Sequence, residues 1–210
     1  MPHMPHLLIP EDVPTFGDEM EGWLKGEDVS LASLLHFFGR RSFALAFVIL
    51  MAPSALPIPT GGVTHVLEFI ALVFAVQLLV GRQDLWIPHR WHHRSVVGDG
   101  NGRLVHGLLR FIRWCERWAR PRGTFLFGHR AGNVVFGLLV LLGAVGALLA
   151  PPFTGLDTLP SLGVVILSLG VLFRDVVIAT LGIVVIAVGI TIEIMLGAAL
   201  INVATSFWPF

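Results

Sequence analysis

The feature that most constrains this chain is an apolar stretch near its carboxyl end, Val176 to Ile201, in which Glu193 is the one ionisable residue. As a helix this stretch would rise about 39 Å, more than the ~30 Å hydrocarbon thickness of a bilayer. Residues Ala131 to Ala150 form a second apolar stretch of spanning length. Hydrophobic residues make up 55% of the chain and charged residues 13%, more apolar surface than a soluble core of this size could bury. We therefore expect an integral membrane protein.

Prolines divide the other apolar sequence into shorter segments. Residues Phe43 to Leu56 would rise only about 21 Å as a helix, and prolines at 53, 57 and 59 forbid a regular continuation. The apolar pattern resumes over Val63 to Val80. In the second half, Leu162 to Phe173 follows another proline-rich break at residues 151–160. The sequence pattern therefore predicts one proline-broken helical hairpin in each half of the chain, either re-entrant or fully spanning.

The two hairpins predict a weak internal repeat. Residues Met51-Ala52-Pro53 align with Leu149-Ala150-Pro151, and Gly81-Arg82-Gln83-Asp84 aligns with Arg174-Asp175. The proline-to-arginine spacing differs, at 29 residues (53 to 82) and 23 residues (151 to 174). The alternative is that the similar order of prolines and arginines in the two halves arose by chance.

The expected fold is an all-α polytopic membrane protein with two such hairpins, interfacial amphipathic helices and a final span. We place a single membrane domain over residues 29–210. It comprises repeat 1 at about 30–84, a basic loop at 85–130 and repeat 2 at about 131–201.

Charge is distributed unevenly along the chain. Residues 1–28 carry seven acidic side chains against Lys25 and no secretory signal pattern, so we expect a flexible acidic tail. Residues 81–130 hold ten arginines against three acidic residues, and the positive-inside rule places this loop in the cytoplasm. The whole chain has a net charge of zero, which argues against nucleic acid as a partner.

Two amphipathic helices are expected beside the spans, one over residues 30–41 and one around residues 104–117. In the second helix, arginines 110, 113 and 117 share a face with His106. This face suits anionic lipid headgroups, with a specific anionic ligand as the alternative.

Two blocks of sequence resemble the ExoD family of bacterial exopolysaccharide-synthesis membrane proteins. They are ALPIPTGGVTHVLEFIALVFAVQLLVGRQDLWIP at residues 55–88 and LDTLPSLGVVILSLGVLFRDVV at residues 156–177. With the arginine-rich middle and the final span, the similarity covers roughly residues 30–200. The resemblance implies a multi-pass inner-membrane protein linked to exopolysaccharide production. It supplies no catalytic residues, and we expect a protein that is not an enzyme.

A candidate anion site lies at the two helix breaks. Free backbone N–H groups at helix starts bind anions. An anionic lipid carrier of the polyprenyl-phosphate type, or a small anion, is the expected ligand for transport or handling. Helix capping is the alternative role for Arg82, Asp157 and Thr158. The candidate residues are Thr60, Gly61, Gly62, Arg82, Asp157, Thr158 and Arg174.

A candidate ion or proton relay consists of His65, Glu68 and Glu193. Ionisable side chains within apolar spans are costly and suggest function. The alternatives are a simple pairing of His65 with Glu68 or a backbone carbonyl, and a position of Glu193 near the outer surface of the membrane. This relay supports a third hypothesis, a proton-coupled ion transporter.

A metal site and a cofactor are not expected. His89, His92 and His93 could share a helical side, but the sequence has no zinc-ligand pattern there and no nearby carboxylate except Asp84. The competing function is a non-catalytic assembly or regulatory subunit. In that hypothesis, small residues serve helix packing, as Gly137, Gly143, Gly146, Gly182 and Gly189 could. Membrane lipids and a second copy of the chain are the other candidate partners.

Overall fold

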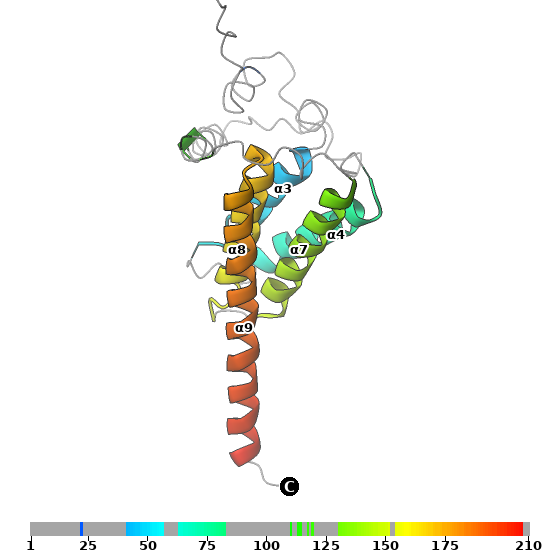
Figure 1. Cartoon of the computed structure of the whole chain (residues 1–210). Coiled ribbons are helices and arrows are strands. Elements are labelled where there is room, and N and C mark those ends of the chain that lie inside the picture. Colours follow the sequence, from blue (N-terminus) through cyan, green and yellow to red (C-terminus); the bar gives the residue numbers. More distant parts are fainter. Residues whose placement is uncertain are drawn as a thin grey trace, which may run out of the picture.

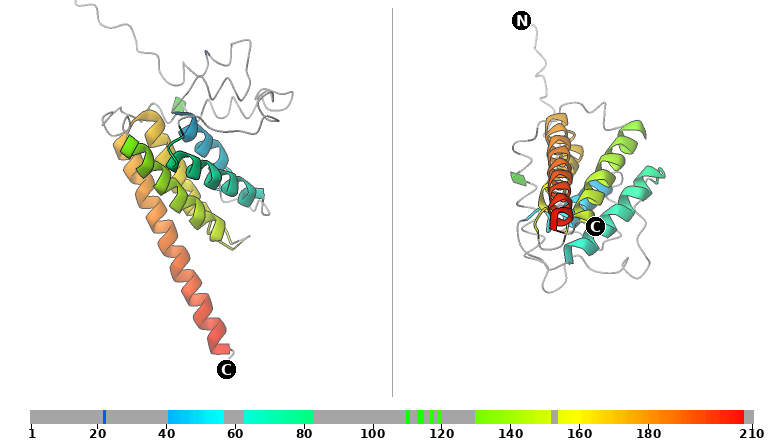
Figure 2. Two further views of the ribbon diagram at one scale, coloured as in Figure 1. Left: turned by 90° about the vertical axis from the view of Figure 1, so that its right-hand side faces the viewer. Right: turned by 90° about the horizontal axis from the view of Figure 1, so that it is seen from below.

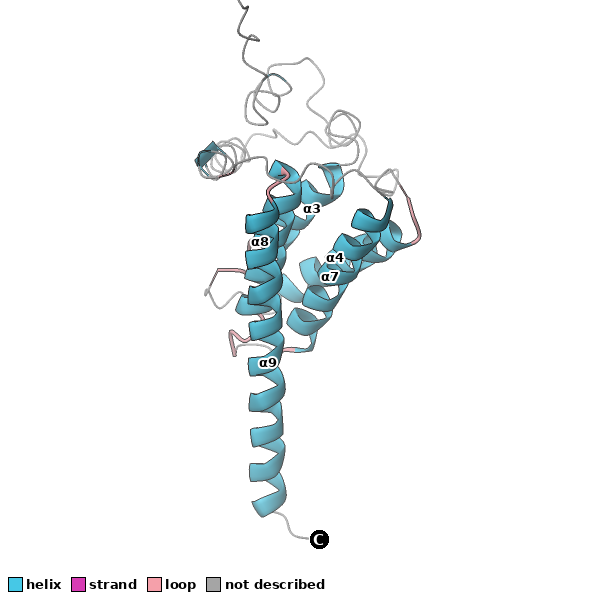
Figure 3. Ribbon diagram, in the orientation of Figure 1, coloured by secondary structure: helices cyan, strands magenta, loops and turns pink. Residues whose placement is uncertain are grey.

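The computed structural model describes residues 41–56, 63–82, 130–151 and 154–207, together with a few isolated positions between 22 and 119. Five α-helices account for nearly all of this part of the chain (Figures 1 and 3). They are α3 (Ser42–Met51), α4 (Val63–Leu79), α7 (Arg130–Leu149), α8 (Thr158–Phe173) and α9 (Val176–Phe207). The described residues contain no strand, which confirms the expected all-α class.

The helices form a bundle from which α9 projects (Figures 1 and 2). Helix α9 runs antiparallel to α8, and α4 lies beside α7, also antiparallel. Helix α3 contacts α8 and α4. Each half thus packs its first helix on the second helix of the other half, α3 on α8 and α7 on α4. The predicted repeat would produce this pattern, but the repeat itself stays a prediction.

Glycines bring the backbones of α8 and α9 into direct contact. A methyl group added at Gly163 would lie 2.6 Å from the Ile186 nitrogen, and one added at Gly189 would lie 2.8 Å from the Pro160 nitrogen. Added methyl groups at Gly170 and Gly182 would likewise meet backbone atoms of the opposite helix. The glycines recur every seven residues on both helices, which fixes one antiparallel register.

The turn between α8 and α9 is held by two linked motifs. Arg174 is left-handed, with φ 56°, and its N–H donates to the Val171 carbonyl at 3.2 Å. The Asp175 N–H donates to the Gly170 carbonyl at 2.8 Å, which completes a Schellman motif. The Asp175 Oδ1 then accepts the Val177 N–H at 2.9 Å and so caps the start of α9.

Helix α4 ends with the same motif. Gly81 is left-handed, with φ 88°, and the Arg82 N–H donates to the Gln77 carbonyl at 3.2 Å. The left-handed position is therefore Gly81 in one half and Arg174 in the other. By this geometry Arg82 corresponds to Asp175, so the alignment that pairs Arg82 with Arg174 is one residue out of step with the structure.

The surface polarity is inverted relative to that of a soluble bundle. Val63, Val66 and Phe69 on α4 are exposed, whereas Glu68 on the same helix is completely buried. Helices α7 and α9 contain segments long and apolar enough to cross a bilayer, Ala131–Leu149 and Val176–Ala199. A surface of large apolar side chains around buried polar groups is typical of a membrane protein. The number of crossings and the choice of membrane stay predictions.

Helix boundaries differ from expectation in three places. Helix α3 ends at Met51, before Pro53, rather than near Leu56. Helix α8 begins at Thr158, before the expected Leu162, because a proline in the first turn needs no backbone partner for its nitrogen. Helix α9 continues to Phe207 rather than ending near Ile201. The acidic tail, the helix expected over residues 30–41, the break at residues 57–62 and the histidines at 89–93 lie outside the described residues.

We predict that Gly182→Ala destabilises the protein, because its methyl group would strike the α8 backbone at Leu167. The expected loss is about 1 to 3 kcal/mol in the free energy of unfolding, the usual cost of overpacking. Gly197→Ala is the matched control on the same helix, since nothing lies within 4 Å of its added methyl. Thermal unfolding in detergent measures both variants. Equal stability of the two would contradict the tight α8–α9 contact.

Candidate functional site

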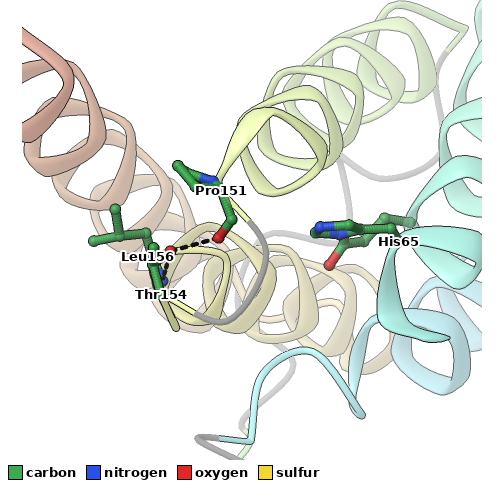
Figure 4. Close-up of polar contacts among 5 residues, drawn as sticks. His65, Pro151, Thr154 and Leu156 are labelled. Atoms are coloured by element: carbon green, nitrogen blue, oxygen red, sulfur yellow. Dashed lines mark hydrogen bonds and ion pairs between the residues drawn. The ribbon is translucent and has the colours of Figure 1, made fainter. Parts of the chain in front are cut away.

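A histidine and a glutamate pair at the start of α4. His65 and Glu68 are three residues apart and therefore share a face of the helix. The His65 Nδ1 and Glu68 Oε2 atoms are 2.7 Å apart. The Glu68 side chain is 0% exposed and that of His65 is 25% exposed. Figure 4 shows His65 on the side of α4 that faces α8 and the α7–α8 connection. The imidazole thus stands between the buried carboxylate and the surface.

Glu193 reaches the same region from α9. A methyl group added at Gly146 of α7 would lie 3.3 Å from the Glu193 Oε2 and 3.6 Å from the Pro160 Cβ. The absence of a side chain at Gly146 therefore leaves room for the carboxylate beside the start of α8. Glu193 interacts electrostatically with Asp157 and with Glu68. We call Glu68, Asp157 and Glu193, together with His65, the carboxylate cluster.

Two carboxylate oxygens of this cluster lack a partner. The Glu68 Oε1 and the Glu193 Oε1 are both buried and accept no hydrogen bond. A buried carboxylate with an unpaired oxygen is costly, and two that act on each other cost more. The cluster therefore calls for a proton or a cation to neutralise it. Glu193 is half-buried with one enclosed oxygen, and its position near the outer surface of the membrane stays the alternative.

The connection from α7 to α8 supports one side of the cluster. The Thr154 hydroxyl donates to the Pro151 carbonyl at 2.6 Å and accepts the Leu156 N–H at 3.4 Å (Figure 4). Asp157 precedes the first residue of α8, but its side chain makes no capping hydrogen bond. Capping thus does not account for Asp157, whose carboxylate instead acts on Glu193.

The structure separates the arginines from this cluster. Arg82 follows the end of α4 and Arg174 follows the end of α8, and both side chains are exposed. The sixteen residues of α8, Thr158–Phe173, rise about 24 Å, so Arg174 lies far from Asp157. One proline-rich break precedes α4 and the other precedes α8, whereas Arg82 and Arg174 follow the ends of these helices. The length of the helix therefore separates each arginine from its break. The described residues do not form the expected anion site with Arg82 and Arg174 beside the breaks. Thr60, Gly61 and Gly62 lie outside them.

The part that sequence reasoning missed is the association of Asp157 with Glu193. The register of α8 against α9 pairs Pro160 with Gly189. One turn beyond that pair, Glu193 comes level with the start of α8. The seven-residue spacing of the glycines was the signal that could have found this association.

Of the residues that the structure describes, no group of three or more His, Cys, Asp or Glu side chains is arranged to hold a metal ion. The histidines at 89–93 lie outside those residues.

Comparison with known proteins gives a family match over most of the chain. The family model described as "Exopolysaccharide synthesis, ExoD" matches residues 18–195. The uncharacterized protein slr1875 of Synechocystis is 28% identical over 184 residues, which cover 88% of this chain and 82% of that protein. Protein ExoD of Rhizobium meliloti is 28% identical over 159 residues, which cover 72% of this chain and 63% of that protein. No solved structure matches.

We predict that His65→Ala strongly destabilises the protein, because it leaves the buried Glu68 carboxylate without its partner. Removing one member of a buried pair costs about 3 to 5 kcal/mol. The double variant His65→Ala/Glu68→Met should recover most of this loss, since the charge is gone as well. Chemical unfolding of the two variants and of Glu68→Met gives the coupling energy. A His65→Ala cost that is the same with and without Glu68 would show that the pair contributes nothing.

Proposed function

The chain belongs to the ExoD family, and we propose that it moves protons across the membrane during exopolysaccharide production, with the carboxylate cluster as its proton-binding centre. The family assignment gives the role in exopolysaccharide synthesis. The observation that carries the proton proposal is the pair of buried, unpartnered oxygens on Glu68 and Glu193.

The chemistry of the cluster favours a proton over other ligands. Glu68 is fully buried beside His65, and Glu193 has one enclosed oxygen, so a protonated His65 would balance only one of these two negative charges. A proton shared by these groups removes charge without needing the coordination shell that a metal requires. Helices α4 and α9 hold opposite sides of the cluster, so loading and releasing a proton changes the electrostatic force between them.

His65 is suited to connect the cluster with its surroundings. Its side chain is partly exposed while Glu68 behind it is fully buried. Imidazole both donates and accepts protons near neutral pH, and one ring nitrogen already lies 2.7 Å from the carboxylate. A proton that reaches the outer ring nitrogen can therefore be passed inward as the inner nitrogen gives one to Glu68.

A second candidate function is the handling of an anionic lipid carrier, and one observation favours it. Arg82 and Arg174 are exposed at the same end of the bundle, where α4 and α8 finish. Arginine binds phosphate oxygens through two parallel N–H groups. A headgroup of the polyprenyl-phosphate type would then bind at this end and not at the helix breaks. Neither function requires the protein to be an enzyme.

The glycines take the packing role that the assembly-subunit hypothesis gives them. Gly143, Gly146, Gly182 and Gly189 all face neighbouring helices of the same chain, and Gly137 faces Leu79. Packing within the bundle does not separate this hypothesis from the other two, so it stays an alternative.

We predict that Glu68→Gln and Glu193→Gln each lower proton flux at least about tenfold, since a relay group contributes roughly 10² to 10⁴ to a proton-transfer rate. The measurement uses proteoliposomes with an internal pH-sensitive dye and an imposed potassium diffusion potential. Thr180→Ala, which removes an exposed hydroxyl of α9, is the control and should leave the flux unchanged. Wild-type flux no greater than that of empty liposomes would overturn the proposal.

The lipid-carrier function gives a separate prediction for the arginines. Arg82→Gln and Arg174→Gln should each weaken binding of a polyprenyl phosphate about ten- to hundredfold, equivalent to one charge-assisted contact of ~1.5 to 3 kcal/mol. Arg174→Lys keeps the positive charge but lacks the two parallel N–H groups of the guanidinium, and should therefore recover only part of the affinity. Binding in detergent, measured by calorimetry, tests this. Unchanged affinity in both Gln variants would leave these arginines as interfacial anchors.

A further inference from the structure

Helix α7 meets the α8–α9 pair through two glycines that have different surroundings. Gly143 and Gly146 are three residues apart and therefore share a face of α7. A methyl group added at Gly143 would overlap the Val164 side chain and lie 3.4 Å from the Ile186 Cδ1. The atoms nearest to Gly143 on the neighbouring helices thus belong to apolar side chains.

Gly146 instead faces the carboxylate of Glu193. A methyl group added there would lie 3.2 Å from the Ile190 Cγ1, 3.3 Å from the Glu193 Oε2 and 3.6 Å from the Pro160 Cβ. The first two contacts are tight, so the carboxylate fills part of the space that a side chain at position 146 would need. Its other oxygen, Oε1, is buried and accepts no hydrogen bond. The glycine therefore gives the carboxylate room without giving it a partner.

The backbone of α7 does not supply that partner either. Gly146 lies in the last turn of α7, where its carbonyl accepts the Ala150 N–H at 3.2 Å. The N–H groups of an α-helix point back along its axis, toward carbonyls four residues earlier. The carboxyl-terminal end of a helix also carries a partial negative charge. Helix α7 therefore offers Glu193 neither a hydrogen-bond donor nor a positive charge.

The ionisable groups that face Glu193 are those of the carboxylate cluster. Asp157 precedes α8, and Glu68 lies with its partner His65 on α4. Asp157 and Glu68 act electrostatically on Glu193. The described segments 42–51 of α3, 131–149 of α7 and 158–173 of α8 contain no ionisable side chain. Position 146 is therefore the place at which α7 could add a hydrogen bond to the cluster or withhold one.

We propose that Gly146 is a positioning residue for Glu193. By lacking a side chain, it keeps the carboxylate beside the start of α8 and leaves it without a donor from α7, so that a proton is the partner this group takes up. The inference rests on the proposed function and adds a residue that carries no ionisable group. A hydroxyl at position 146 would compete with the proton, because a donated hydrogen bond favours the charged carboxylate.

Stability and flux together separate this role from packing alone. Gly146→Ala displaces the end of a flexible, half-buried side chain and should change the melting temperature little. Gly143→Ala, the matched control on the same face, forces its methyl group into Val164 and should lower the melting temperature by about 2 to 10 °C.

The flux of the folded protein should follow the opposite order. In the proteoliposome assay Gly146→Ala should lower flux about three- to tenfold, because a misplaced relay group loses rate steeply. Gly143→Ala, which touches no carboxylate, should keep at least about half of the flux. A larger loss in Gly143→Ala than in Gly146→Ala, in both stability and flux, would show that Gly146 serves only packing and would overturn the proposal.

Gly146→Ser supplies the donor that glycine withholds. Its hydroxyl extends one bond beyond the Cβ position, which is 3.3 Å from the Glu193 Oε2, and so comes within hydrogen-bond distance. The pH at which half of the Glu193 side chains hold a proton should then fall by about one unit or more relative to wild type. Gly146→Ala, which lacks the hydroxyl, should not lower it.

This half-loading pH is measured without reference to flux. Infrared difference spectra of the detergent-solubilised protein, recorded against pH, follow the C=O stretch of a protonated carboxyl group, and Glu193→Gln identifies the band of Glu193. An equal half-loading pH in Gly146→Ser and wild type, or no Glu193 band at any pH, would overturn the proposal. A lowered half-loading pH in Gly146→Ser, together with wild-type protein that conducts no protons, would support the role of Gly146 and reject the proposed function.

Discussion

The contact between the backbones of α8 and α9 is the constraint on which the rest of the structure depends. Glycines at seven-residue intervals on both helices let each chain approach the other without an intervening side chain. Such close approach strengthens dispersion. It leaves little freedom to slide, because three of the four glycines face a larger residue of the opposite helix, Ile186, Leu167 or Pro160. That register sets Pro160 against Gly189 and so carries Glu193 to the start of α8. The carboxylate cluster is a consequence of it.

Within this frame the bundle exposes large apolar side chains that a soluble protein would bury. Valines and a phenylalanine of α4 face outward, while Glu68 on the same helix faces the interior. Burying a carboxylate there is costly, and the fold offsets only part of that cost through His65. The unpartnered oxygens of Glu68, Glu193, Ser161 and Ser168 remain. These polar groups lower the stability of a bundle that is otherwise filled with apolar side chains. Their presence is the physical basis for proposing proton movement in this region.

Local sequence predicted the parts that depend on neighbouring residues. Apolar runs bounded by prolines and glycines placed α4 and α7 to within a residue, because helix length and breaks are local properties. The spacing of His65 and Glu68 predicted a pair, because residues three apart share a helix face. The start of α8 was placed too late, since Pro160 was treated as part of the break although the first turn accepts it.

The sequence by itself determined that the chain is helical and built for a membrane, since apolar run length and the scarcity of charge decide both. Only the tertiary structure decided which polar residues meet. It joined Asp157 and Glu193, thirty-six positions apart, through the α8–α9 register (193 − 157). It also separated Arg82 and Arg174 from the breaks that sequence proximity had linked to them. Each residue adds about 1.5 Å to the length of a helix, so residues at its two ends lie far apart. Which polar residues lie close together therefore depends on how the helices pack.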